Sequence, residues 1–216
     1  VRWRHPERGV VPPDDFIPFA EQHGLIGRID SFVLDEACRQ LAEWTSSDGW
    51  PSAFTMAVNV SGRELLDPEF TGRVAEVIDR HGIEPSLLCL EITETAFVGQ
   101  WGDLQEKLSA LSKLGVRLAL DDFGTGYSSL AHLQRTKVDI LKIDRSFVAQ
   151  IGRSSRDREI VAAVTAMSHA LGITVVGEGI ETSNQLDTLA GLDCDQGQGF
   201  LFAHPLSPEA VAALVA

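Results

Sequence analysis

Cysteine is scarce in this sequence, and the spacings that would give it a structural role are missing. The three cysteines, Cys38, Cys89 and Cys194, are far apart, odd in number and never in a C-x-x-C arrangement. This pattern argues against a disulfide framework and against a structural zinc site. We therefore expect three ordinary core or surface thiols.

Long apolar segments are absent as well. No window approaches about 18 uninterrupted apolar residues, the length that a spanning helix needs. The N-terminus also lacks the charged and then apolar order of a secretory signal. We expect this domain to be cytoplasmic and to make no direct membrane contact, while upstream segments of a parent protein remain free to anchor it in a membrane.

Basic residues are too few for a nucleic-acid-binding protein. The chain carries 18 Lys and Arg against 31 Asp and Glu, a formal net charge of −13. Because a long nucleic acid is bound through cations that neutralise its phosphates, this balance excludes a nucleic-acid polymer as partner. Much of the acidic excess has a simple reading as surface solubility, so the informative question is whether a few carboxylates converge.

The order of apolar runs predicts a parallel α/β fold in one domain that covers residues 1–216. Short, nearly continuous apolar runs alternate with longer amphipathic stretches, which is typical of repeated βα units whose strands are buried on both faces. The predicted strands are Phe54–Val60, Leu87–Ile92, Val116–Leu120, Ile140–Ile143, Thr174–Val176 and Gly199–Phe202. The predicted helices are Asp14–His23, Arg28–Trp44, Asp67–His81, Asp103–Leu114, Ser154–Leu171 and Thr182–Ala190, several of them followed by a capping glycine.

Two architectures fit such units, a TIM-like (β/α)8 barrel and an open doubly wound sheet. No G-x-G-x-x-G or G-x-x-x-x-G-K-[ST] follows a strand, so the open sheet lacks its usual nucleotide-binding signature. The sequence therefore favours the barrel, with N-terminal strand or strands not present in this chain.

Polar residues lie at the ends of six successive predicted strands. They are Asn59; Glu91 and Glu94; Asp121 and Asp122; Lys142 and Asp144; Glu178; and Gln198. In a parallel barrel the carboxyl ends of the strands meet on one face, so these side chains should converge there. Taken singly, each has a simpler reading as a helix cap or a solvated loop residue, and Asp144 and Glu94 are the members most easily explained that way.

Converging carboxylates repel one another, and cations are the natural remedy. Ligation by Asp, Glu and an Asn carbonyl suits Mg²⁺ or Mn²⁺ better than zinc. The adjacent Asp121 and Asp122 favour two ions over one, and two ions about 3.5–4 Å apart are the usual device for in-line hydrolysis of a phosphodiester. The following loop, through Leu130, carries two glycines and several hydroxyls, which suits a mobile loop or an ordinary turn in which Ser128 or Ser129 caps a helix.

Eight motifs in order resemble the signatures of the EAL-domain family. They are Arg2-Trp3-Arg4-His5-Pro6, Phe16-Ile17-Pro18-Phe19-Ala20-Glu21, Asn59-Val60-Ser61, Glu91-Ile92-Thr93-Glu94, the loop from Asp121 to Leu130, Lys142-Ile143-Asp144, Gly177-Glu178-Gly179-Ile180-Glu181 and Gln198-Gly199-Phe200-Leu201. The resemblance covers essentially the whole chain, and the aspartate loop is its most specific part. It implies a barrel enzyme that opens cyclic di-GMP to linear pGpG with two Mg²⁺ or Mn²⁺ ions and that Ca²⁺ inhibits.

The resemblance also implies roles for individual residues. Asn59, Glu91 and Asp121 would hold the first ion, Asp121 and Asp122 the second, and Glu178 would lie beside the second ion and take part in catalysis. Lys142 would position or activate the attacking water or stabilise phosphate charge, two roles that the sequence leaves open. Glu94 would anchor the flexible loop, while Arg2, Asp144 and Gln198 would contact the substrate.

Two departures from the family pattern matter. The Glu-Ala-Leu motif is expected immediately before Val1, so the chain as given should lack one metal-binding glutamate and hydrolyse little by itself. Glu64 stands where a glutamine is common. The resemblance further implies a homodimer and an upstream sensory or diguanylate-cyclase-like domain. Two alternatives stay open: a non-catalytic EAL-like domain that binds cyclic di-GMP or a protein partner, and a barrel enzyme for another phosphate ester.

Overall fold

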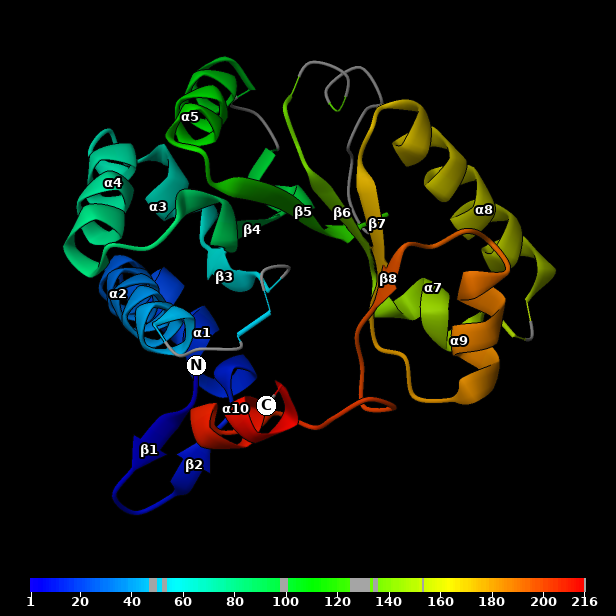
Figure 1. Cartoon of the computed structure of the whole chain (residues 1–216), viewed down its shortest axis with the longest axis horizontal. Coiled ribbons are helices and arrows are strands. Elements are labelled where there is room, and N and C mark those ends of the chain that lie inside the picture. The colour runs from blue at the N-terminus through cyan, green and yellow to red at the C-terminus, as the bar shows by residue number, and fades with distance from the viewer. Residues whose placement is uncertain are drawn as a thin grey trace.

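The structure is a computed structural model that describes residues 1–46, 50–51, 54–97, 101–124, 133, 136–152 and 154–215. Its centre is a parallel sheet in the order β3-β4-β5-β6-β7-β8 (Figure 1). These strands are Met56–Val60 (β3), Leu88–Thr93 (β4), Arg117–Phe123 (β5), Ile140–Ile143 (β6), Thr174–Gly177 (β7) and Gln196–Gly197 (β8). Each strand lies beside the next one in the chain, whereas a doubly wound sheet reverses its order at a switch point. The barrel prediction is therefore confirmed.

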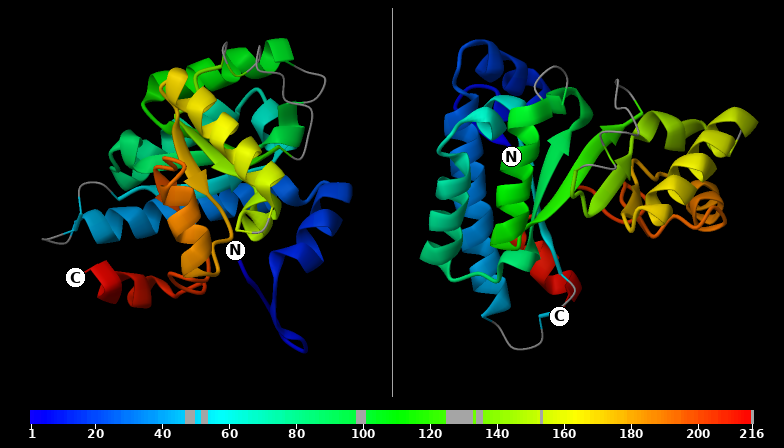
Figure 2. Two further views of the ribbon diagram at one scale, coloured as in Figure 1. Left: turned by 90° about the vertical axis from the view of Figure 1, so that its right-hand side faces the viewer. Right: turned by 90° about the horizontal axis from the view of Figure 1, so that it is seen from above.

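Helices lie around this curved sheet. They are α1 (Pro13–Gln22), α2 (Ile26–Thr45), α3 (Gly62–Leu66), α4 (Phe70–His81), α5 (Trp101–Leu114), α7 (Arg145–Gln150), α8 (Ser155–Ala170), α9 (Ser183–Ala190) and α10 (Pro208–Val215), with short 3₁₀ turns η1 (Pro85–Leu87) and η2 (Glu94–Phe97). In Figures 1 and 2, α2 to α5 lie on the β3–β5 side and α7 to α9 on the β6–β8 side. Of the described helices, none is both long enough and apolar enough to cross a membrane.

The core lies between the sheet and these helices. Strand β4 is buried along almost its whole length, and Leu88, Leu90 and Ile92 are at most 1% exposed. This burial explains why the central strands are continuous apolar runs rather than alternating ones. Two cysteines, Cys38 and Cys89, belong to the buried set, and all three thiols are free, as the sequence predicted.

An antiparallel hairpin near the N-terminus was not predicted. Its strands are Trp3–His5 (β1) and Gly9–Val11 (β2), and they form a separate two-stranded sheet. Figure 1 places the hairpin away from the main sheet, beyond α1. Its strands are too short, and too close to Pro6 and the charged turn, to give a periodic signal.

Several predicted boundaries were wrong, and two of these differences are informative. The last strand was expected at Gly199–Phe202 but lies at Gln196–Gly197, because Phe200 and Phe202 form a turn and are 56% and 54% exposed. The helix expected from Asp67 begins at Phe70, after a separate short helix, α3. Asp67 has extended backbone angles and its side chain accepts a hydrogen bond from the Glu69 amide, which favours a turn over a continued helix.

Candidate active site

The register of the sheet directs polar side chains from successive strands to one face. Asn59 pairs with Glu91, and Glu91 pairs with Ala119, two positions before Asp121. Further along, Lys142 pairs with Val176, two positions before Glu178. Since side chains two residues apart lie on the same face of a strand, this register places all these groups on the inner face near the carboxyl ends.

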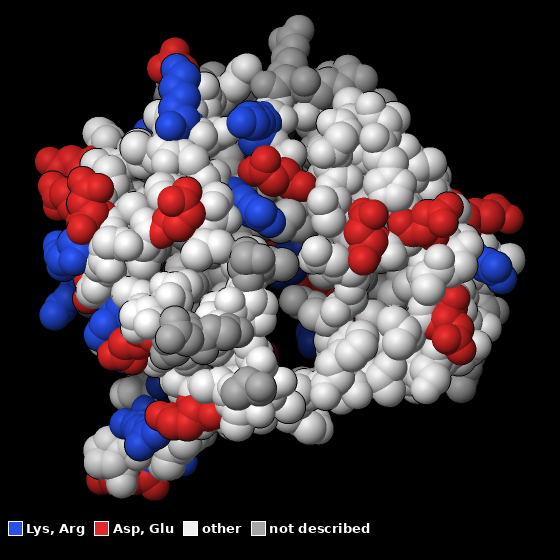
Figure 3. All heavy atoms as spheres, viewed as in Figure 1, with Lys and Arg blue, Asp and Glu red and all other residues white. Residues whose placement is uncertain are grey.

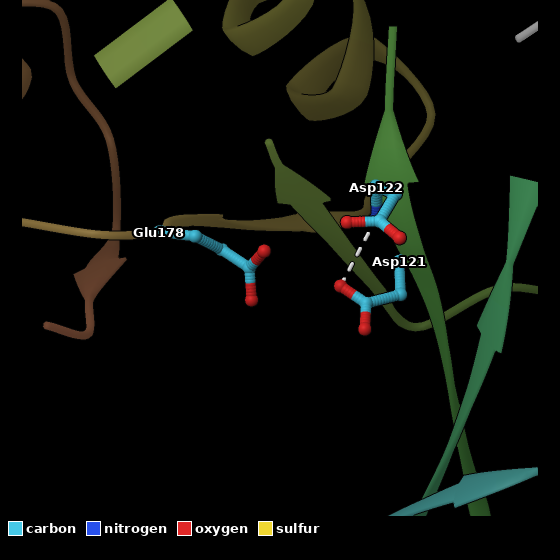
Figure 4. A group of neighbouring side chains, drawn as sticks. All are labelled: Asp121, Asp122 and Glu178. Atoms are coloured by element: carbon cyan, nitrogen blue, oxygen red, sulfur yellow. Dashed lines mark hydrogen bonds between the residues drawn. The ribbon is translucent and has the colours of Figure 1, made fainter. Parts of the chain in front are cut away.

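A β-bulge in β5 adds a second aspartate to this face. The pairing of β5 with β6 shifts between Leu120 and Phe123, and Asp122 has a φ of 54°, in the left-handed region. Without the bulge, adjacent side chains would point to opposite faces. Instead, carboxylate oxygens of Asp121, Asp122 and Glu178 all lie within 4.8 Å of one another. Figure 4 shows Glu178 reaching from the opposite side toward the two aspartates, whose shared hydrogen bond joins the Asp122 amide to Asp121 Oδ1 at 3.0 Å.

Lys142 is the cation at the centre of the group. Its Nζ lies 2.8 Å from Glu91 Oε1, 3.1 Å from Asp121 Oδ1 and 2.7 Å from Glu178 Oε1. The lysine is 4% exposed, and Glu91 and Asp121 are each 8% exposed. An ammonium has three N–H donors, so these carboxylates occupy all of them.

Burial and charge shift the acidities of these groups. Burial acts to lower the pKa of Lys142, but the attraction of Glu91, Asp121 and Glu178 outweighs it and raises that pKa above its ordinary value. Burial raises the pKa of Glu178 to about 7 despite the opposing effect of Lys142. The pKa of Glu91 is also raised by burial. Keeping several buried carboxylates charged beside a single ammonium costs free energy. A divalent cation bound at this site can neutralise them.

Other predicted residues surround this centre. Asn59 Nδ2 donates to Glu91 Oε2 at 3.2 Å, and Gln198 Nε2 donates to Glu178 Oε1 at 2.5 Å. Glu94, 2% exposed, accepts a hydrogen bond of 2.9 Å from the amide of Gly124 and so contacts the start of the loop after β5. The remainder of that loop, with Ser128 and Ser129, lies outside the described residues.

Two residues predicted to contact the substrate, Asp144 and Arg2, do not join the carboxylate group. Asp144 is the N-cap of α7, where its Oδ1 accepts a hydrogen bond of 2.9 Å from the Ser146 amide, so its observed contacts fit the capping reading. Arg2 is exposed; its guanidinium donates to the Val1 carbonyl, and it lines an apolar cavity with Trp3 and Phe16 rather than joining the carboxylate group. Substrate contact by either residue stays a prediction.

Sequence reasoning missed the bulge and the threefold pairing of Lys142. Two adjacent acidic residues at the end of an apolar strand, followed by Phe-Gly, would have signalled a break in the alternation. The three contacts of Lys142 depend on strand neighbours that no local pattern reveals. Glu64 is also unusual: it is 7% exposed and paired with Arg73 at 2.5 Å, away from the carboxylate group.

Curated relatives match this chain over all or nearly all of its length. The chain is 41% identical over 216 residues to the bifunctional diguanylate cyclase/cyclic di-GMP phosphodiesterase MucR of Pseudomonas aeruginosa, covering 100% of this chain and 31% of that protein. It is 42% identical over 206 residues to the cyclic di-GMP phosphodiesterase NbdA of the same species, covering 95% of this chain and 26% of NbdA. The chain thus spans about a quarter to a third of the length of these relatives.

Solved structures of similar domains have the same fold as this chain. The MucR phosphodiesterase in complex with c-di-GMP superposes with a TM-score of 0.92 at 40% identity, covering 97% of this chain and 84% of that one. The EAL domain of Mycobacterium smegmatis DcpA gives a TM-score of 0.83 at 37% identity, covering 88% and 85%. The family model described as EAL domain matches residues 1–205. The chain therefore belongs to the EAL-domain family.

Proposed function

We propose that this domain hydrolyses cyclic di-GMP to linear pGpG with the help of two divalent cations, Mg²⁺ or Mn²⁺. The observation that carries the proposal is the group of four carboxylates, Glu91, Asp121, Asp122 and Glu178, at the carboxyl ends of neighbouring strands. The relatives named as cyclic di-GMP phosphodiesterases support the choice of substrate.

The donor set fits the proposed ions. When all four carboxylates are ionised, the single ammonium of Lys142 leaves three negative charges uncompensated, and the neighbouring Asn59 offers an amide oxygen. Hard oxygen ligands of this kind suit Mg²⁺ and Mn²⁺. Asn59, Glu91 and Asp121 would hold one ion, and Asp121, Asp122 and Glu178 the other. Bound ions would supply positive charge for the phosphodiester and would lower the pKa of a water molecule.

The residues of the chain then have separate tasks. Lys142, with its three donors on three carboxylates, keeps these groups at a fixed separation and adds positive charge beside the phosphate. This arrangement favours charge stabilisation over proton abstraction for Lys142, the choice that the sequence left open. Gln198 orients Glu178 through its hydrogen bond, and Glu94 fixes the start of the loop at Gly124.

The charge of this domain suits a small ligand better than a long one. The face in Figure 3 is hollowed near its centre, in the region that lies between β3 and β8 in Figure 1, and acidic side chains are scattered over its outer surface. A cyclic dinucleotide carries only two phosphate charges, so bound cations and Lys142 can offset them. The acidic outer surface would repel a longer nucleic acid.

Turnover of cyclic di-GMP in Mn²⁺ buffer, followed by chromatography of pGpG, tests the proposal in the full-length protein. Asp121→Asn should lower turnover at least 100-fold because it removes a ligand shared by both ions, while Asp187→Asn, an exposed change on α9, should leave it unchanged. Binding of cyclic di-GMP without pGpG release would instead support a binding module. Release of phosphate from another ester, but not from cyclic di-GMP, would support a different barrel hydrolase. Either result contradicts the proposal.

A further inference from the structure

Hydrogen bonds from a partly buried serine join the turn that follows β3 to helix α2. Ser61 comes directly after β3, and its Oγ accepts a hydrogen bond of 3.2 Å from the Glu64 amide and caps α3. The same hydroxyl donates to Asp30 Oδ2 at 2.6 Å, and the Ser61 amide donates to that oxygen at 3.2 Å. One carboxylate oxygen on α2 therefore holds both the backbone and the side chain of this turn.

Asp30 makes these contacts from a half-buried position on α2. Burial raises the pKa of Asp30, and its hydrogen bonds with Ser61 work against that rise. Among the described residues, no Lys, Arg or His forms an ion pair with Asp30. Asp35, on the same helix, differs: it pairs with Arg80 and His81 near the surface. The environment of Asp30 therefore suits an acceptor that fixes a neighbour rather than a member of a surface ion pair.

The turn lies close in sequence to a residue of the candidate site. In the described sheet β3 pairs with β4, and Asn59 lies opposite Glu91. Asn59 is two residues before Ser61, and its amide reaches Glu91 at 3.2 Å. The bonds from Asp30 therefore act at the carboxyl end of the strand that carries Asn59.

We propose that Asp30, acting through Ser61, is a positioning residue that holds the Asn59 amide in place at the metal site. The inference rests on the proposed function, because it concerns the geometry of the ions proposed there. Groups that orient a metal ligand without touching the metal commonly change metal affinity about 10–100-fold when removed. Asn59 would be a single neutral ligand among several carboxylates, so a loss of about 10-fold in Mn²⁺ affinity is expected.

Calorimetric titration of the full-length protein with Mn²⁺, below the unfolding temperature of every variant, tests this inference. Asp30→Ala should weaken Mn²⁺ binding about 10-fold. Asp30→Asn should stay within about 3-fold of wild type, because one amide oxygen can accept both bonds now made to Oδ2. Asp35→Ala, a change on the same helix that breaks two contacts away from the site, should leave Mn²⁺ affinity unchanged.

A double-mutant cycle identifies the route of the effect. If Asp30 acts through Asn59, adding Asp30→Ala to Asn59→Ala should change Mn²⁺ affinity no further. Four results would each overturn this inference and leave the proposed function intact. Asp30→Ala could bind Mn²⁺ as tightly as wild type, or the losses could be additive in the double variant. Alternatively, Asp35→Ala or Asp30→Asn could lose as much Mn²⁺ affinity as Asp30→Ala. Absence of Mn²⁺ binding in the wild type would overturn the proposed function and this inference with it.

Discussion

Replacing Lys142 by methionine should destabilise the metal-free domain strongly. The Nζ atom lies 2.7–3.1 Å from three carboxylates. At an effective dielectric constant of about 20, one contact at this distance is worth about 5–6 kcal/mol before desolvation is counted. Because burial of the ammonium offsets much of that gain, the expected loss is the roughly 3–5 kcal/mol typical of removing one partner from a buried ionic group. For a domain of this size, that loss corresponds to a fall in Tm of about 6–20 °C.

Protons and metal ions should each restore part of this loss. Without Lys142, the carboxylates take up protons more readily, so the difference from wild type should be smaller at pH 6 than at pH 8. Mn²⁺ should raise the Tm of Lys142→Met at least as much as that of the wild type, because it supplies the missing positive charge. At 100 times the dissociation constant, a bound ion adds about 2.7 kcal/mol.

The assay is thermal and urea unfolding in EDTA and in Mn²⁺, at pH 6 and pH 8. Lys113→Met, which removes an exposed lysine from α5, is the matched control and should change Tm by less than about 2 °C. Equal Tm values for Lys142→Met and Lys113→Met in EDTA would refute the reasoning. A Mn²⁺ effect present in the wild type and absent in Lys142→Met would show that Lys142 supports the ions rather than substituting for their charge.

Three further predictions concern other groups. Gly199→Ala would place a Cβ 2.2 Å from facing backbone atoms, so this change should lower Tm sharply. Gly72→Ala adds a Cβ in open space on α4 and should leave Tm unchanged or raised, as thermal unfolding of both variants would show. Burial raises the pKa of Glu178 from 4.5 to about 7. The contribution of protonated Glu178 to stability is therefore full below about pH 4.5 and is lost as the pH rises through 7. In urea titrations across that range, the metal-free wild type should lose stability relative to Glu178→Gln. Arg73→Ala leaves the buried Glu64 unpaired and should cost about 2–3 kcal/mol in urea unfolding, a value that a loss below about 0.5 kcal/mol would contradict.

Much of the fold could be predicted because the central strands carry strong local signals. Strand β6 was predicted with the bounds observed, Ile140–Ile143, since a continuous buried run has sharp ends. The polar β8 could not be found this way, because its two residues gain their strand geometry from β7 rather than from their own side chains. Phe54 misled the prediction of β3 for a related reason: it packs against Trp44 and Trp50 before the strand begins.

The convergence of the candidate site was predictable from topology alone. Once the strands are parallel and consecutive, Asn59, Glu91 and Glu178 must end on the same face. Asp122 was predicted to converge there as well, but the bulge that turns it to this face was not, because strand topology alone does not show where a bulge falls. The anchoring contact from Asp30 is likewise invisible in sequence, since it joins a helix to a turn 31 residues away.

Anomalous diffraction from crystals of the full-length protein soaked with Mn²⁺ and cyclic di-GMP tests the central claim most directly. The account predicts two manganese peaks about 3.5–4 Å apart, with Asp121 bound to both and Asp122 and Glu178 bound to or beside the second. The Lys142 ammonium should remain in contact with the same carboxylates. A single peak, or peaks away from these carboxylates while cyclic di-GMP is bound, would contradict the two-ion account.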